Sequence, residues 1–317
     1  MKLAATTPFD ITGTVRLDSA SSVADASLRM LAEHFSAEEL NSGFLRRCFE
    51  DIEAAFWGEY SGYLKCDTPY HDLRHSLDTA LLVSRMVCGY QMGLASQERL
   101  SGKEAQLGVF LALYHDIGFL RKTEENHLFG AQLVFQHEQR SVDFARTYLL
   151  GSELSEYADS SELIHVTNFA HSTADVLHGH PAQQAALARM IGSADLISQV
   201  SDRCYLERCR DFLFREFNLA GADRLREADG SERIVYLDGE DLLLKTPSFY
   251  NHLVKKRLEN DFEDVQAVLD LYFGTQNPYA DSMNANLSYL KTLLEENRLR
   301  EGLRRHPVPL LPDSELV

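Results

Sequence analysis

Apolar residues recur with a helical period along nearly the whole chain. Such patterns cover residues 36–60, 70–90, 103–117, 127–150, 153–170, 182–217, 249–273 and 282–299, with internal breaks in some of them. Ser36 and Glu39 form a capping-box pattern that predicts a helix start, and Gly118 and Gly151 stand where glycine caps are expected. No repeat of 20–50 residues is visible. The pattern therefore predicts an all-α protein built as a helical bundle.

One segment departs from the helical period. Residues 233–245, RIVYLDGEDLLLK, contain two β-leaning runs around Asp238-Gly239, a dipeptide that favours a tight hairpin turn. We therefore expect one small β-hairpin near residues 233–245. The resulting organisation has N-terminal helices in 1–60, a core in 61–220, the hairpin and C-terminal helices in 221–305, and an irregular, proline-containing tail in 306–317.

Composition and charge narrow the partners of the protein. The five cysteines form no CxxC pair, and the N-terminus has no basic segment followed by an apolar one, so we expect a cytoplasmic protein with reduced thiols. The longest nearly apolar run, 108–114, is far shorter than the roughly 20 residues that span a bilayer. The net charge of −17 argues against nucleic acid as a partner. An anionic substrate would be repelled unless a bound divalent cation supplied local positive charge.

The first group of candidate residues lies in residues 68–80, TPYHDLRHSLDTA. Thr68 followed by Pro69 predicts a helix start. On that helix His71, His75 and Asp78 would occupy positions i, i+4 and i+7 and share one face. Two histidines one turn apart are a common way to hold a metal ion, although a surface pair with Asp78 as a structural residue explains the same spacing.

Two further groups place acidic side chains where burial is expected. His115 and Asp116 follow the apolar run LGVFLALY, and Asp195 lies within the apolar segment ALARMIGSADLI. A buried carboxylate is costly unless it meets a cation, several hydrogen-bond donors or a proton. A metal ion would satisfy His115 and Asp116 together. Local backbone capping, or an arginine beside Asp195, would satisfy each carboxylate separately.

Together these residues form the order H…HD…D, with spacings of 40 and 79 residues, on three predicted helices. This order resembles the HD superfamily of metal-dependent phosphohydrolases. The segment YHDLRHSLDTA, residues 70–80, is similar to the motif of class I cyclic-nucleotide phosphodiesterases within that superfamily. The resemblance covers about residues 65–200 and implies a helical metal-binding core in 61–220.

The resemblance also implies roles for individual residues. The ligands of the tighter metal would be His75, His115, Asp116 and Asp195. Asp116 would bridge to a second ion, with a catalytic hydroxide between the two, and His71 would be the general acid that protonates the leaving oxygen. Asp78 would have a structural role. His137 would lie at the second metal, and His165 and His171 are weaker candidates for the same place. Zinc, manganese, magnesium and iron all suit such ligands.

Three departures from the phosphodiesterase pattern bear on the substrate. Asp72 replaces an asparagine, no glutamine that would grip a nucleobase follows Glu216-Phe217-Asn218, and HDIGF is not followed by the GYP motif of cyclic-dinucleotide enzymes. Phe249 and Tyr250 would serve as an aromatic wall or as core residues. We therefore predict a metal-dependent phosphohydrolase that acts on a nucleotide or other small phosphoester, without nucleic acid or membrane as partners.

Two other functions fit the same residues. A di-iron oxygenase would need further ligands, which His137 with His165 or His171 would supply. A non-catalytic sensor or scaffold would keep the pocket for ligand binding alone. Metal analysis together with a substrate panel separates the three functions.

Overall fold

The computed structural model describes residues 8–93, 99–227 and 229–307, and within them the protein is mostly helical with one two-stranded antiparallel sheet. The longer α-helices are α1 (Ala20–Leu31), α2 (Ser42–Trp57), α3 (Leu73–Gly93), α4 (Gly102–Tyr114), α5 (His137–Leu150), α7 (Ala182–Ser201), α10 (Gly239–Phe249) and α12 (Pro278–Glu295). The shorter ones are α6 (Thr173–Leu177), α8 (Tyr205–Arg208), α9 (Phe214–Ala220), α11 (Val268–Phe273) and α13 (Leu299–Gly302).

Short 3-10 and π-helical segments connect these helices. The 3-10 segments are η1 (Ile117–Phe119), η2 (Thr123–Glu125), η3 (Gly130–Leu133), η4 (Ser155–Thr167) and η8 (Val265–Ala267), and the π segments are η5 (Cys209–Leu213), η6 (Tyr250–Val254) and η7 (Arg257–Asp261). The predicted helix in residues 153–170 is therefore 3-10, and those in 182–217 and 249–273 are broken into several pieces.

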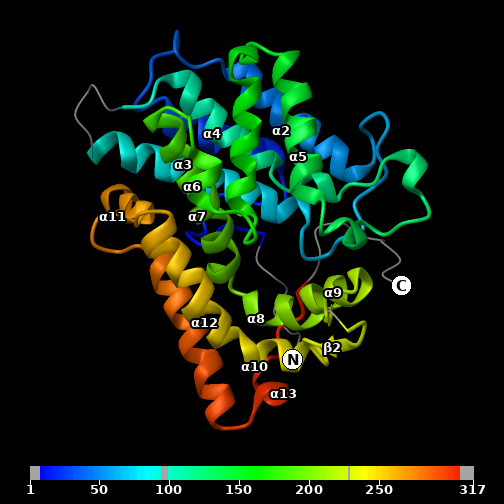
Figure 1. Cartoon of the computed structure of the whole chain (residues 1–317). Helices are drawn as coiled ribbons and strands as arrows, with labels where there is room; N and C mark the ends of the chain where they lie inside the picture. The colour runs from blue at the N-terminus through cyan, green and yellow to red at the C-terminus, as the bar shows by residue number, and fades with distance from the viewer. Residues whose placement is uncertain (1–7, 94–98, 228, 308–317) are drawn as a thin grey trace.

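Helices α3, α4 and α7 pack against one another at the centre of the upper body in Figure 1. The N-terminal helices α1 and α2 cover α3 and α4, while α5 and η4 pack together beside them. Below, α8, α9, α10, α13 and the hairpin form the lower part of the molecule (Figure 1). Helix α12 runs diagonally and packs on α7, while α11 packs on α3. One hydrophobic cluster includes Leu31, Leu81 and Leu290, so the N-terminal, central and C-terminal segments share a core.

Burial follows the apolar sequence pattern closely in the central helix α4. In α4 every residue from Ala105 to Tyr114 is buried, as its nearly continuous apolar sequence predicts. All five cysteines are buried and free of disulfides. Within the described ranges, no helix has both the length and the apolarity to cross a membrane.

The predicted hairpin exists, but its position was wrong. The strands are β1 (Arg224–Arg226) and β2 (Glu232–Ile234), with Arg224 opposite Ile234. Asp238 instead caps α10, because its carboxylate accepts the backbone N–H of Asp241 at 2.8 Å. Aspartate followed by glycine suits a helix N-cap as well as a hairpin turn, and the acidic residues of the next turn favour the cap.

The start predicted from Ser36 and Glu39 was also wrong by six residues. The Glu39 carboxylate does accept the Ser36 backbone N–H at 2.9 Å, but this contact closes only an isolated turn. Helix α2 begins at Ser42, where the Asn41 side chain accepts the backbone N–H of Phe44. The Asn41 cap therefore decides where α2 begins.

The two glycines expected as caps have different roles. Gly151 is the C-cap residue of α5, with φ of −89°. Gly118 lies within η1 without a left-handed φ, and it is needed for close packing, because a Cβ there would clash with the backbone carbonyl of His137 on α5. Gly118 therefore fixes how closely α5 approaches the segment that follows His115 and Asp116.

Replacing Gly118 with Ala should lower the free energy of unfolding by about 1–3 kcal/mol, because the added methyl group meets backbone that cannot rotate away. Gly151→Ala is the matched control, since the nearest atom to its Cβ lies 3.7 Å away. Urea denaturation of both variants measures the difference. Equal stability of the two variants would contradict the packing role of Gly118.

Candidate metal centre

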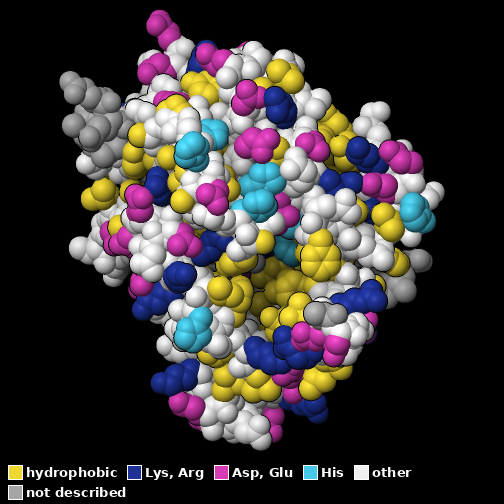
Figure 2. All heavy atoms as spheres, viewed as in Figure 1, with side chains coloured by type: hydrophobic (Ala, Val, Ile, Leu, Met, Phe, Trp, Pro, Cys, Tyr) yellow, Lys and Arg dark blue, Asp and Glu magenta, His cyan; other side chains and the backbone are white. Residues whose placement is uncertain are grey.

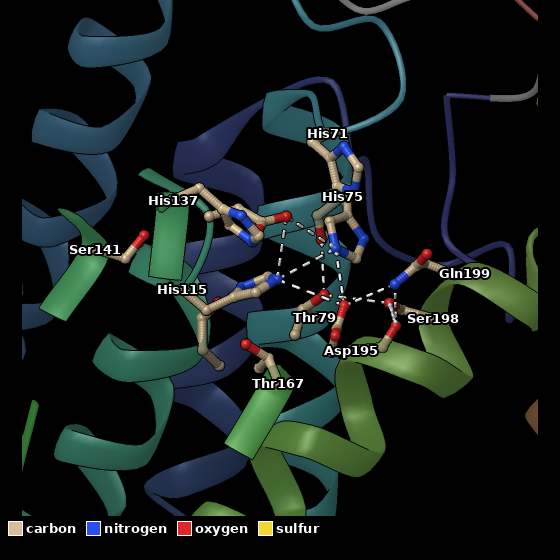
Figure 3. A network of polar contacts seen from close by, with 12 residues as sticks. His71, His75, Thr79, His115, His137, Ser141, Thr167, Asp195, Ser198 and Gln199 are labelled. Atoms are coloured by element: carbon tan, nitrogen blue, oxygen red, sulfur yellow. Dashed lines mark hydrogen bonds and ion pairs between the residues drawn. The ribbon is translucent and has the colours of Figure 1, made fainter. Parts of the chain in front are cut away.

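Three helices bring two histidines and a carboxylate together in the core. His75 on α3, His115 directly after α4, and Asp195 on α7 are buried, and their ligand atoms all lie within 4.8 Å of one another. Figure 3 shows these side chains pointing toward a common centre. This group has the residue types and the separation to hold a metal ion.

The distances within the cluster match donors around one ion. The Nε2 atoms of His75 and His115 are 3.2 Å apart, and Asp195 Oδ1 lies 3.1 Å from the first and 3.5 Å from the second. Ligands about 2.0–2.2 Å from an ion are separated from each other by about 3–3.5 Å in tetrahedral or octahedral geometry. The spacing therefore fits neighbouring positions of one coordination shell.

Asp116 adjoins this cluster on the side of the two imidazoles. Its Oδ2 atom lies 3.4 Å from His75 Nε2 and 3.3 Å from His115 Nε2. The same oxygen is buried and accepts no hydrogen bond from the described residues. A buried carboxylate oxygen without a donor needs a compensating cation or proton. The residues present therefore fit a metal ion at this point.

The tautomer of His115 directs its lone pair into the cluster. Its Nδ1 atom lies 2.7 Å from the carbonyl oxygen of Ala112 and must donate to it. In the neutral ring Nε2 then carries the lone pair that a metal would use. Burial lowers the pKa of His115, but the nearby carboxylate of Asp116 outweighs burial and raises the pKa overall. Proton binding and metal binding thus compete for the same nitrogen.

A second set of contacts extends from the other oxygen of Asp116. His137, at the start of α5, has its Nε2 atom 3.5 Å from Asp116 Oδ1, and its Nδ1 donates to the Val134 carbonyl at 2.6 Å. Burial lowers the pKa of His137 to about 4, so the ring is neutral and its Nε2 lone pair faces the carboxylate. Asp116 therefore stands between two groups of nitrogen donors, as a carboxylate that bridges two ions would.

Asp195 is held in place by residues on its own helix and beside it. Gln199 Nε2 donates to Asp195 Oδ1 at 2.7 Å, and the side-chain oxygen Oε1 of Gln199 accepts a hydrogen bond from the Tyr70 hydroxyl at 2.9 Å. Such supporting hydrogen bonds fix the orientation of ligand carboxylates. Sequence reasoning missed Gln199, although its i+4 spacing from Asp195 is a visible signal.

His71 does not share a helix with His75, which corrects the prediction for residues 68–80. Helix α3 begins at Leu73, because the carboxylate of Asp72 caps the N–H of His75 at 3.1 Å. Thr68 does not cap this helix; its hydroxyl donates to the His71 carbonyl at 2.9 Å. His71 therefore lies in the bend before α3, with its ring centroid 6.3 Å from that of His75.

The ring of His71 is fixed by two contacts at the rim of the cluster. Its Nδ1 atom lies 2.6 Å from Oε2 of Glu216, a residue of α9 that is only 3% exposed. Its ring stacks on Phe119 at 4.5 Å, and Phe119 stacks in turn on His137 at 4.1 Å. Burial lowers the pKa of His71, but the Glu216 carboxylate more than compensates and raises it overall. Nδ1 therefore faces the Glu216 carboxylate, and Nε2 takes no part in that contact.

Sequence reasoning missed both Glu216 and Phe119. Glu216 lies 145 residues from its partner, and no spacing rule connects the two. The segment FLFREFNLA also contains Arg215 and Asn218, so Glu216 did not stand out there as a buried polar residue. Phe119 was visible as part of HDIGF but resembled an ordinary core residue.

The remaining candidates lie in other surroundings. His165 and His171 contact each other, with ring centroids 4.9 Å apart, and His165 faces Glu162 at 3.5 Å. Asp78 lies on α3 and lines a small pocket together with His75. Burial raises the pKa of the Asp78 carboxyl to about 7. Phe249 packs edge-on against Phe169 at 5.5 Å, while Tyr250 packs against the hydrophobic core.

A scan against protein-family models finds no match for this chain, and a search of curated proteins finds no similar sequence. The site is therefore interpreted from its own geometry.

Asp116→Ala should abolish stoichiometric metal binding while the helical content stays close to that of the parent. One oxygen of Asp116 lies beside His75 and His115 and the other beside His137, so its loss affects both proposed ion positions. The helical content should persist because α4 ends before Asp116. Asp159→Ala is the matched control, because that side chain is 85% exposed. Elemental analysis and circular dichroism measure the two effects. Full metal content in Asp116→Ala, or none in the parent after incubation with divalent salts, would contradict the assignment.

Proposed function

We propose that this protein is a metal-dependent phosphohydrolase of the HD class, which acts on a nucleotide or another small phosphoester. The observation that carries the proposal is the buried Oδ2 atom of Asp116, which faces two imidazole nitrogens and has no donor. The order of the ligands along the chain, H…HD…D, supports the same class.

The proposed ligands divide into two sets that share Asp116. One ion would be held by His75, His115, Asp116 and Asp195, and a second by Asp116 and His137. Divalent ions held there would supply positive charge to the phosphoryl oxygens and lower the pKa of a water molecule. This positive charge would also offset, at the site, the net charge of −17 that would otherwise repel an anionic substrate.

The proton donor in this proposal is His71. Its Nδ1 is bound by Glu216, so a proton on Nε2 is available to the leaving oxygen of a phosphoester. The stack on Phe119 limits rotation of the ring. The side chain is 16% exposed, which leaves it in reach of a substrate at the rim.

The face of the molecule drawn in the space-filling view is hollowed (Figure 2). Figure 2 shows a hollow in this face, lined by hydrophobic side chains, with Lys and Arg side chains along its lower edge. A mostly apolar pocket with a few polar groups is the usual form of a small-molecule site.

A panel of alkyl and aryl phosphoesters and nucleotides, assayed with zinc, manganese, magnesium and iron, tests the class of reaction. Metal-dependent release of phosphate or of a phosphomonoester is the expected result. Oxygen uptake with an iron-dependent absorption band would instead indicate an oxygenase. Saturable binding without turnover of any substrate would indicate a sensor.

Replacing His71 with Ala should reduce the rate on alkyl phosphoesters by about 10²–10⁴-fold, the usual cost of losing a general acid. The loss should be much smaller for nitrophenyl esters, whose leaving groups scarcely need a proton. Metal content should stay unchanged. His127→Ala, at an exposed position, serves as the matched control. An equal loss for both kinds of ester would remove His71 from this role.

Glu216→Gln should move the alkaline fall of kcat/KM to lower pH. Glu216 raises the pKa of His71, so the protonated acid persists to higher pH in the parent, and its activity is lost as pH rises through that pKa. Removing the Glu216 carboxylate takes away the largest influence that raises this pKa, so the pKa falls. The pH profiles of parent and variant, both loaded with metal, give the shift. An unmoved alkaline limb would show that another group governs it.

A further inference from the structure

A groove of about 430 Å³ lies beside the metal centre and shares none of its residues. Its walls are formed by α6 with the segment before it, by Arg189 of α7, and by residues of η6 and η7. Its cationic side chains are Arg189, Lys256 and Arg257, while Phe169 and Leu253 contribute an apolar part. This volume is within the range of roughly 300–1,000 Å³ that is typical of small-molecule pockets.

Arg257 is a buried cation that lacks an ion-pair partner. It is 5% exposed, yet none of the described carboxylates lies within 4.0 Å of its guanidinium. Its Nη atoms donate to the carbonyls of Asn168 and Val166, both at 2.9 Å, and its Nε has no partner. Neutral carbonyls satisfy the donors, and Asp261 and Asp195 attract the charge only from beyond ion-pair distance. The guanidinium therefore has no direct counter-ion among the described residues, and such a buried charge is costly.

A second arginine of the groove shows a similar deficit. Arg189 forms an ion pair with Glu263 at 2.6 Å, but its Nε is buried without a hydrogen-bond partner. Lys256 is exposed at the same groove. Three cations thus line a groove that has two carboxylates, Asp261 and Glu263, in a chain whose net charge is −17. A local excess of positive charge in so acidic a protein favours an anionic ligand.

The apolar side of the groove indicates what the anion is attached to. Phe169 is 44% exposed and Leu253 is 45% exposed, although both belong to a groove that also contains buried residues. Phe249 supports Phe169 edge-on, and the Arg257 guanidinium lies 5.1 Å from the Phe169 ring centroid. An exposed ring beside a guanidinium suits an aromatic or apolar body joined to an anionic group.

We propose that this groove binds a small phosphorylated ligand of nucleoside-monophosphate size. Arg189, Lys256 and Arg257 bind the phosphate, and Phe169 with Leu253 contacts the attached base or apolar group. Phosphate is favoured over a carboxylate because its three terminal oxygens can accept from all three cationic side chains. The site goes beyond the proposed hydrolase function and does not depend on it.

The test uses metal-loaded protein and three probes: AMP, inorganic phosphate and adenosine. Equilibrium dialysis gives the number and affinity of sites, and amide chemical shifts locate them. Lys256→Met and Arg189→Gln remove groove cations at positions where the fold does not depend on carbonyl contacts. Arg257→Met is compared with Arg257→Lys, which keeps the charge. Arg46→Gln is the control, since Arg46 is exposed on α2 and pairs only with Asp25.

AMP should shift the amides of Thr173, Lys256 and Asn260, separately from any shifts around His115. Lys256→Met and Arg189→Gln should each weaken binding of AMP and phosphate at this site by roughly 10-fold, the worth of one charge-assisted contact. Adenosine should bind more weakly than AMP, and Arg46→Gln should match the parent.

Chemical-shift changes confined to the metal centre would overturn the inference. Unchanged affinity in Lys256→Met, Arg189→Gln and Arg257→Met alike would also overturn it, and Arg257 would then only bind two backbone carbonyls. Adenosine binding as tightly as AMP would overturn recognition of the phosphate. A protein without any phosphohydrolase activity that still binds AMP in the groove would retain this inference and lose the proposed function, so the two failures are distinguishable.

Discussion

The burial of two carboxylates and two imidazoles at the crossing of α3, α4 and α7 is the constraint on which the rest of the structure depends. Asp116 and Asp195 lie in a core made up mainly of aliphatic and aromatic side chains. Their negative charge would cost several kcal/mol in that position without compensation. The helices can therefore pack this closely only if the polar atoms meet one another, protons or a cation. A metal ion would satisfy all four groups with one charge centre.

Small residues at the helix crossings allow these side chains to converge. A Cβ on Gly108 of α4 would come within 2.7 Å of Leu187 on α7, and one on Gly192 of α7 would reach the ring of Phe262 at 2.5 Å. These glycines let α4 and α7 pack closely against neighbouring side chains, and His115 Nε2 lies 3.5 Å from Asp195 Oδ1 in this packing. Gly118 does the same for α5 and so brings His137 to Asp116. The packing of the glycines and the geometry of the ligands are thus one property of the fold.

The sequence was informative where the signal is local and misleading where two local signals compete. The helical period predicted the all-α class, and apolar runs around His115 and Asp195 predicted burial. Asp238-Gly239 suits both a turn and a helix cap, and the cap prevailed because acidic residues follow it. Asp72, and not Thr68, caps the start of α3, so His71 lies before the helix. Glu216 was beyond prediction, since its contact with His71 exists only after α9 has folded against the bend.

That last contact shows how the two parts of the molecule divide the chemistry. The proposed metal ligands all come from the upper body, whereas the residue that binds His71 comes from α9 in the lower part. Glu216 also accepts the Tyr70 backbone N–H at 2.6 Å, so one buried carboxylate holds both the bend and the imidazole. Arg208, on α8, reinforces the same bend through the Tyr70 carbonyl at 2.7 Å. A change in the packing of α8 and α9 would therefore alter the position and the pKa of His71. Because Arg208 also contacts Asp72, whose carboxylate accepts the backbone N–H of His75, such a change would reach the first turn of α3 as well.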